Sequence, residues 1–225
     1  MKAARGTPWR FIALNGVGAF ALLAFTLAMV FGSSLERPHL LLDIVLPLLT
    51  LLAFVWLDLL LLFFRDPERR VGEGCVAPAD GRVEAASVSG GVARVSIFLG
   101  VFNVHVVRAP LSGRVTRLEH RPGGRRLAFS KESAHNQRVV VELAGEGGPA
   151  VLTLIAGAFA DRILPYVAVG DLLSKGERLG IIKFGSRVDL EVPALPPLAL
   201  LVKPGDTVKA GETAILAPPR EAASP

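Results

Sequence analysis

Apolar residues are concentrated in the first 65 positions of this 225-residue chain. Residues 11–31 form an uncharged apolar run that is long enough to cross a membrane as a helix, because a span needs about 20 residues. A second apolar run covers residues 40–64 and contains two aspartates. The first run is too long for the apolar core of a cleaved signal peptide, and it lacks a small-residue cleavage site. The pattern therefore predicts a transmembrane helical hairpin that anchors residues 1–64.

The pattern changes after residue 70, where glycine and proline become frequent and helical periodicity fades. Short runs of β-favouring residues recur, with turn signals between them. We predict strands at residues 81–86, 93–99, 103–107, 113–119, 138–143, 151–156, 180–183, 188–192, 199–203 and 213–216. Many short strands of this kind are typical of a sandwich or barrel. Residues 65–225 are therefore expected to form one all-β soluble domain.

A weak internal repeat refines this expectation. Residues 169–177 resemble residues 204–212, since in both a Gly-Asp pair is followed by a Gly-Glu pair at the same offset. The pattern resembles the turns of lipoyl- and biotinyl-carrier modules, which are small β-sandwiches of two related halves. The lysine motif of those modules is absent, and both dipeptides also occur in ordinary turns. The expected fold is an all-β barrel or sandwich with lipoyl-like half-repeats behind the hairpin.

The distribution of basic residues predicts the orientation of the chain in the membrane. Three basic residues precede the first apolar run and three follow the second, whereas the connection between the runs contains only Arg37. Basic residues favour the cytoplasmic side, so both termini and the soluble domain are expected there, on the cytoplasmic membrane. The net charge of +5 comes without a lysine-rich run or interleaved aromatic residues. This favours attraction to an anionic membrane surface rather than to nucleic acid.

Cysteine and histidine are scarce. The chain has one cysteine, Cys75, and four scattered histidines. A single cysteine cannot form an internal disulfide, which fits a reducing compartment. These residues do not provide the spacing of a zinc site, so the sequence predicts no metal.

The pair Gly185-Ser186 separates two β-type runs, residues 179–183 and 187–192. A Gly-Ser pair in this position ordinarily marks a bend between strands. The alternative is that the chain cuts itself at this pair and converts Ser186 into its own cofactor. The rest of the sequence has to distinguish these two interpretations.

Four stretches together favour the second interpretation. They are Phe63-Phe-Arg-Asp-Pro-Glu-Arg69, Ala77-Pro-Ala-Asp-Gly-Arg-Val83, Phe102-Asn-Val-His-Val-Val-Arg-Ala-Pro-Leu-Ser-Gly113 and Phe184-Gly-Ser-Arg-Val-Asp189. In this order and spacing they resemble the phosphatidylserine decarboxylase family, particularly its short bacterial and archaeal branch. The resemblance extends from about residue 63 to residue 216.

The resemblance implies a proenzyme that breaks the Gly185–Ser186 bond. The hydroxyl of Ser186 would attack the carbonyl of Gly185, and elimination would leave a pyruvoyl group at position 186. The products would be a β-chain of residues 1–185 and an α-chain of residues 186–225. A serine hydroxyl needs a base to become a good nucleophile. The resemblance supplies His105 as the base and Asp80 as its orienting partner, with the roles of a catalytic triad.

The mature activity implied by the resemblance is decarboxylation of phosphatidylserine to phosphatidylethanolamine. The amine of the lipid headgroup would form a Schiff base with the pyruvoyl group, which would accept the electron pair released with CO2. The cofactor is thus covalent, with neither a metal nor pyridoxal phosphate. A substrate in the membrane would explain the hairpin. The basic residues that could contact the lipid phosphate, or simply face anionic lipid, are Arg138, Arg162, Lys183 and Arg187.

One position departs from the family pattern. Many relatives have a second histidine three residues after the first, where this chain has Arg108. Either His105 serves both self-cleavage and decarboxylation, or Arg108 acts electrostatically.

Two other functions stay open at this stage. The same chemistry would serve an archaetidylserine-type lipid with ether-linked chains, because the reacting headgroup is identical. The repeat alone would also suit a non-enzymatic, membrane-tethered lipoyl-like module that binds a partner. The anchor is compatible with a membrane-bound assembly, but the sequence does not distinguish a monomer from a homo-oligomer.

Overall fold

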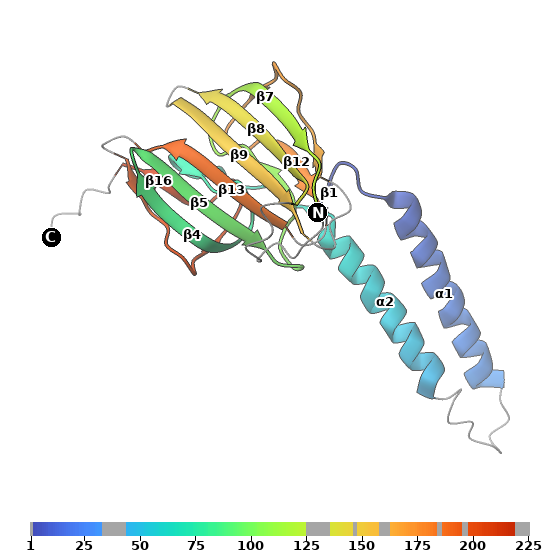
Figure 1. Cartoon of the computed structure of the whole chain (residues 1–225). Helices are drawn as coiled ribbons and strands as arrows, with labels where there is room; N and C mark the ends of the chain where they lie inside the picture. Colours follow the sequence, from blue (N-terminus) through green and yellow to red (C-terminus); the bar gives the residue numbers. More distant parts are fainter. Residues whose placement is uncertain are drawn as a thin grey trace. The chain divides into compact units, whose positions relative to one another are not determined.

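The computed structural model contains two units (Figure 1). One unit is helical and comprises residues 6–65, and the other contains the remaining described residues and is mainly β. The structure describes residues 2–32, 44–124, 136–145, 148–157, 163–183, 186–194 and 198–218.

The helical unit is a pair of apolar helices, α1 (Trp9–Gly32) and α2 (Leu46–Phe63). Many of their large apolar side chains face outward, as expected for helices surrounded by lipid. Both helices are long and apolar enough to cross a membrane, which indicates membrane association. They contact each other through a hydrogen bond of 2.9 Å between the Thr26 and Thr50 hydroxyls and an edge-to-face contact of Phe20 with Phe54.

The other unit is built from short strands, and the predicted all-β domain is confirmed. The strands are β1 (Lys2–Ala3), β2 (Arg65–Asp66), β3 (Cys75–Val76), β4 (Gly81–Ser89), β5 (Val92–Leu99), β6 (Val106–Arg108), β7 (Gly113–Arg121), β8 (Arg138–Gly145), β9 (Gly148–Ala156), β10 (Ile163–Pro165), β11 (Leu172–Leu173), β12 (Arg178–Ile182), β13 (Ser186–Pro193), β14 (Ala199–Leu200), β15 (Thr207–Val208) and β16 (Ala214–Ala217).

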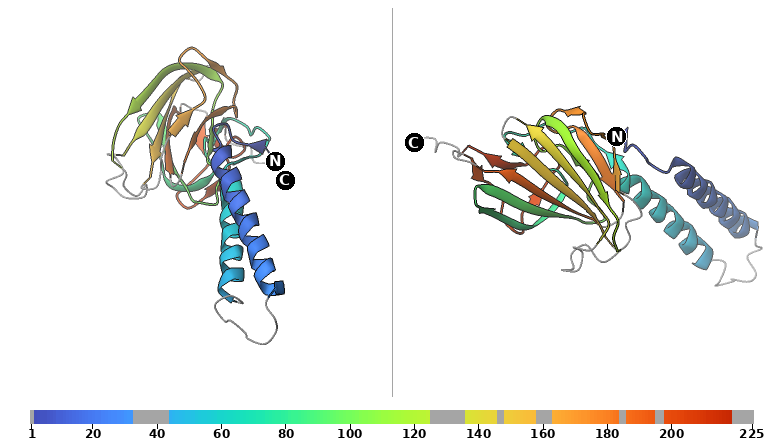
Figure 2. Two further views of the ribbon diagram at one scale, coloured as in Figure 1. Left: turned by 90° about the vertical axis from the view of Figure 1, so that its right-hand side faces the viewer. Right: turned by 45° about the horizontal axis from the view of Figure 1, so that its top comes forward.

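Eight of these strands form one antiparallel sheet in the order β11-β7-β8-β9-β13-β5-β4-β15. This sheet curls into a half-barrel (Figure 2), and two three-stranded sheets, β10-β12-β6 and β14-β16-β3, lie beside it in the β unit, together with the two-stranded pair β1-β2. Side chains alternate between the two faces of each strand. On β5, for example, Val95, Ile97 and Leu99 are buried in the core.

The long strands lie where the sequence predicts them, and the differences have local causes. The short strands β3, β11 and β15 have only two residues each, too few to show a periodic pattern. The strand expected at residues 103–107 begins only at Val106. Asn103 closes a turn instead, because its side-chain oxygen accepts a hydrogen bond from the Gly100 amide at 2.8 Å. His105 therefore lies just before β6 rather than within a strand.

The Gly-Asp repeat corresponds to two equivalent turns. Gly170 and Gly205 both have positive φ angles, 102° and 98°. The aspartates that follow them accept equivalent backbone hydrogen bonds, at 2.8 Å for Asp171 and 3.0 Å for Asp206. The strands that come next, β11 and β15, occupy the two opposite edges of the large sheet. The repeat is therefore an architectural duplication that supplies both edges.

A second repeat belongs to the same duplication. Residues 77–83 and 109–115 share the pattern Ala-Pro-x-x-Gly-Arg-Val. The two arginines make matching bonds, Arg82 to the carbonyl of Gly205 and Arg114 to the carbonyl of Gly170. Each half of the sheet thus binds its own Gly-Asp turn.

We expect the threonine pair to couple the two helices. In a double-mutant cycle, Thr26→Ala and Thr50→Ala should show a coupling free energy of about 0.6 kcal/mol, and at most about 1.7 kcal/mol. The measurement is equilibrium unfolding of the full chain in detergent. A cycle of Asn15→Ala with Thr50→Ala is the control, because Asn15 lies about 16 Å from Thr26 along α1. Additive effects at Thr26 and Thr50 would contradict the hydrogen bond.

Candidate active site

Ser186 is the first residue of β13, the strand that lies between β5 and β9. It pairs with Leu99 on one side and Ala156 on the other, and it is fully buried. Among the residues that the structure describes, its Oγ has no hydrogen-bond partner. Burying a hydroxyl without a partner costs about 1–3 kcal/mol. Ser186 is thus an unusual place for a hydroxyl that only shapes a turn, and the predicted cleavage partner Gly185 lies outside the described residues.

His105 is fully buried beside the end of β12, the strand that leads towards Ser186. Its Nδ1 lies 2.9 Å from the carbonyl oxygen of Asn103, and its own carbonyl accepts a hydrogen bond from Ile182, the last residue of β12. A carbonyl oxygen can only accept, so we assign the ring proton to Nδ1. The other ring nitrogen, Nε2, then carries the lone pair that a base requires.

Asp80 lies in the turn before β4 and is buried. Its Oδ1 accepts a hydrogen bond from the Ala210 amide at 2.8 Å, and its Oδ2 accepts one from Arg69 at 2.8 Å. The register places β5 between the start of β4 and Ser186, which corresponds to about 10 Å between their backbones. The role of Asp80 as orienting partner of His105 stays a prediction.

Comparison of the two halves of the sheet shows that the two hydrogen bonds of Asp80 have different origins. In the other half of the sheet, Ser112 occupies the equivalent position and accepts a hydrogen bond from the Lys175 amide at 2.9 Å. This bond matches the one between Asp80 and Ala210, so that contact belongs to the architecture of the turn. The ion pair with Arg69 has a different origin, because it involves the segment that follows the second helix.

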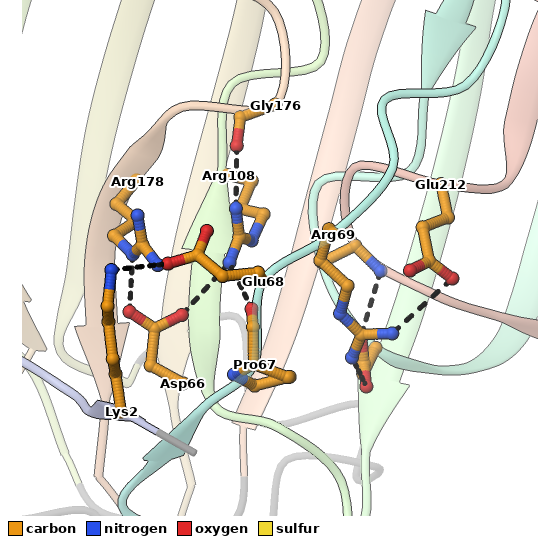
Figure 3. Close-up of polar contacts among 11 residues, drawn as sticks. Lys2, Asp66, Pro67, Glu68, Arg69, Arg108, Gly176, Arg178 and Glu212 are labelled. Atoms are coloured by element: carbon orange, nitrogen blue, oxygen red, sulfur yellow. Dashed lines mark hydrogen bonds and ion pairs between the residues drawn. The ribbon is translucent and has the colours of Figure 1, made fainter.

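Arg108, the position at which the sequence departs from the expected family pattern, is buried among fixed partners. Its guanidinium donates to Asp66 and to the carbonyls of Pro67 and Gly176, each at 2.9 Å (Figure 3). Burial is the main influence on the pKa of Arg108 and lowers it, while the charge of Asp66 opposes the change. These contacts give Arg108 a structural task, which is to hold Asp66 and Pro67 in place within the β unit.

The same segment is fixed by further ion pairs (Figure 3). Asp66 also binds Arg178, and this hydrogen bond is the main cause of the raised pKa of Arg178. Arg69 lies 3.5 Å from a carboxylate oxygen of Glu212, in addition to its bond with Asp80. Residues 66–69 are therefore tied to the rest of the β unit by several charges, which the sequence motifs did not indicate.

The basic residues predicted to contact lipid phosphate lie in different places. Arg138 and Arg187 lie on the outer face of the sheet, because their neighbours Val139 and Val188 are buried on the inner face. Lys183 follows β12 and precedes the predicted cleavage site. The remaining candidate, Arg162, lies outside the described residues.

A cavity of about 940 Å³ lies away from Ser186, at the opposite end of β13. Its lining includes Pro193, Lys175 and the buried thiol of Cys75, whose pKa is raised to about 12 by burial. The strand rises by about 23 Å between Ser186 and Pro193. Within the described part of the chain, no group of three His, Cys, Asp or Glu side chains could hold a metal ion.

Comparison with known proteins decides the family. The model of the phosphatidylserine decarboxylase family matches residues 56–216. The chain belongs to the phosphatidylserine decarboxylase family. It is 47% identical over 158 residues to the phosphatidylserine decarboxylase proenzyme of Streptomyces griseus, covering 69% of this chain and 73% of the relative. It is 51% identical over 156 residues to a Halobacterium salinarum protein named "Putative archaetidylserine decarboxylase proenzyme", covering 68% of this chain and 78% of the relative.

Membership of the phosphatidylserine decarboxylase family confirms the resemblance carried by the four sequence stretches. It also favours the enzymatic interpretation over a lipoyl-like binding module, because the family is one of carboxy-lyases. The structure adds contacts that the motifs did not indicate, namely those of Arg69 and the Asp66–Arg178 pair. The signal was present in the stretch after the second apolar run, but charges in that position are ordinarily assigned to orientation in the membrane.

We expect Arg108 to act in this family member as a structural residue. Arg108→Gln should destabilise the fold by about 3 kcal/mol or more, because it breaks a buried ion pair and leaves Asp66 with one partner fewer. The measurement is urea unfolding of the full chain in detergent, in a Ser186→Ala background. Arg94→Gln is the matched control, since its exposed pair with Glu191 should contribute at most about 1 kcal/mol. Equal losses for the two variants would contradict this role.

Proposed function

We propose that this protein is a phosphatidylserine decarboxylase proenzyme that cuts itself before Ser186 and then converts phosphatidylserine to phosphatidylethanolamine and CO2. The observation that carries the proposal is the fully buried Ser186 hydroxyl at the start of a central strand, in a chain of this family. A hydroxyl that only shaped a bend would gain by facing water or a hydrogen-bond partner. The buried hydroxyl fits a group that is consumed in a reaction.

Self-cleavage is assigned to residues of the chain itself. Nε2 of His105 would accept the hydroxyl proton, and Oγ of Ser186 would attack the carbonyl carbon of Gly185 to form an ester in place of the peptide bond. Loss of the α-proton of residue 186 would then release Gly185 as a carboxylate. Hydrolysis of the resulting unsaturated residue would release its nitrogen as ammonia and leave a pyruvoyl group. The hydrogen bond to the Asn103 carbonyl supports the assignment, because it fixes the ring with Nε2 as the base.

The mature site would combine that pyruvoyl group with a buried environment. When present, the group supplies a carbonyl that binds the substrate amine and accepts the electrons left by CO2. The strand neighbours of Ser186, Leu99 and Ala156, are buried, as is His105, so water would be excluded from such a site. We propose that His105 also returns a proton to the product and so serves both steps, while Arg108 holds the fold.

The two products of cleavage would stay together. The α-chain, residues 186–225, would contain β13, which pairs with β5 and β9 of the β-chain on its two sides. Two further strands, β15 and β16, pair with β4 and β3. Arg69 and Asp80 of the β-chain would also bind Glu212 and Ala210 of the α-chain. Separation of the chains would break all of these contacts.

Location follows from the two candidate membrane helices. They support attachment to a membrane, where a phospholipid substrate also lies. The basic residues on either side of the hairpin favour the cytoplasmic face for both termini and for the site. Lys183, which precedes the cleavage site, is our candidate for contact with the headgroup phosphate.

Self-cleavage can be followed on a denaturing gel. We expect the wild-type chain to yield two products, residues 1–185 and 186–225, and Ser186→Ala to remain whole. His105→Ala should slow cleavage by about 100-fold or more, the usual contribution of a general base. His120→Ala is the control, because His120 is exposed on β7 and the variant should cleave at the normal rate.

Mass spectrometry completes this test. The small chain should begin with a blocked pyruvoyl end rather than a serine amine. An intact wild-type chain of unchanged mass would overturn the proposal.

The name of the Halobacterium relative suggests archaetidylserine as a second candidate substrate. Its headgroup is identical to that of phosphatidylserine, whereas its chains are joined to glycerol by ether rather than ester linkages. Because the reacting groups are the same, we expect values of kcat/KM for the two lipids that agree within about tenfold. The measurement is CO2 release from mixed micelles containing either lipid. A difference much greater than tenfold would show that the site also reads the lipid tails.

A further inference from the structure

A row of arginines crosses the outer face of the large sheet, one residue further along β13 than Ser186. The register of the strands aligns, from β4 to β7, Arg82, Phe98, Arg187, Ile155, Arg138 and Arg121. Neighbouring strands lie about 4.8 Å apart, so this arginine row is about 24 Å long. It contains four positive charges and no acidic residue.

The arginine row points away from the core. The residues next to it along the strands, such as Val83, Ile97 and Val188, are buried on the inner face, so the row itself lies on the opposite face. Arg82 and Arg121 are exposed, Arg138 and Arg187 are half-buried, and Ile155, which lies between the last two, is 2% exposed. The two end arginines are therefore presented at the outer surface, at the end of the strands where Ser186 lies, whereas the centre of the row is partly covered.

The like charges of the arginine row destabilise the sheet when no anionic partner is bound. Arg121 and Arg138 are directly opposite each other, and like charges in that position destabilise a sheet. Asp189 lies 3.0 Å from Arg187 and Glu119 lies 2.7 Å from Arg121, but both carboxylates are two residues away from the row. The Arg121–Glu119 pair is exposed and therefore weak, so an external anion can compete with it, whereas the Arg187–Asp189 pair is largely buried.

The partner that suits such a surface is an anionic lipid headgroup layer. Planar guanidinium groups bind phosphate oxygens in a bidentate manner, and Phe98 adds an apolar contact between two of them. Nucleic acid carries phosphate too, but the two candidate membrane helices hold this chain at a bilayer. Charge complementarity and location therefore both favour lipid.

We propose that the arginine row binds the anionic headgroups of the membrane and so sets the Ser186 end of the sheet against the lipid surface. The binding itself does not depend on the enzymatic activity. Its consequence for substrate access rests on the proposed function, because the row would bring the site to a lipid substrate.

A fluorescent label at two positions tests this proposal in the full chain. Thr207→Cys places a label in register with Arg82, at the end of the row. Ser87→Cys is the matched control, because Ser87 is exposed on the same strand as Arg82, about 16 Å away. Cys75 should stay unlabelled, since it is 4% exposed and burial raises its pKa to about 12. A Ser186→Ala background keeps the chain whole, so the result is independent of self-cleavage.

The readout is quenching of the label by a nitroxide on lipid headgroups in nanodiscs of phosphatidylcholine, with or without phosphatidylglycerol. With phosphatidylglycerol we expect quenching at position 207 to exceed that at position 87 by at least about twofold. Salt near 1 M should remove the difference, because the Debye length falls to about 3 Å. The double variant Arg121→Gln, Arg138→Gln should remove it as well, whereas Arg94→Gln, further along the same face, should not.

Several outcomes would overturn the proposal. One is equal quenching at the two labelled positions. Another is quenching at position 207 that is unaffected by phosphatidylglycerol. If the double variant fails to fold, the salt series on the unsubstituted row still tests whether the quenching depends on charge. Tight binding of a DNA oligonucleotide through the row, without quenching by lipid, would assign the surface to nucleic acid instead.

Discussion

The pairing of β13 with β5 on one side and β9 on the other is the constraint on which the rest of the structure depends. Ser186 is the first paired residue of that strand, so its backbone is held from both sides. Strand geometry then determines the direction of each side chain. Ser186 faces the core and Arg187 faces outward, which separates a buried interior from a charged exterior within two consecutive residues. Charge also acts inside the molecule, where the segment from Asp66 to Arg69 is fixed by buried partners.

The fold could be predicted well where the sequence is periodic. The alternation of Ala93, Val95, Ile97 and Leu99 predicted β5 correctly, and the long apolar runs predicted both helices. Two-residue strands such as β11 were missed, because tertiary pairing alone defines them. His105 was expected on a strand and lies in front of one, since a local turn at Asn103 takes precedence over the alternating pattern.

The candidate site could be predicted only in part. The types of residue were suggested by motifs, but their partners were not, because side chains far apart in sequence meet only in the folded chain. The buried bond from Arg108 to Asp66 is an example, and the contact of His105 with the nearby Asn103 carbonyl depends on a local turn that the motifs did not indicate either. Neither a buried ion pair nor a carbonyl that selects a tautomer leaves a pattern in the sequence.

The two matching halves of the sheet have a consequence for how the site could have arisen. Both halves use the same Ala-Pro-x-x-Gly-Arg-Val turn, yet one has Ser112 where the other has Asp80. Both side chains accept the same kind of backbone hydrogen bond. The scaffold therefore tolerates either residue at this point, and a carboxylate could be introduced in one copy while the other copy preserved the shape. In a sheet of two matching halves, one turn can therefore hold a carboxylate while the other keeps the same backbone hydrogen bond with a hydroxyl.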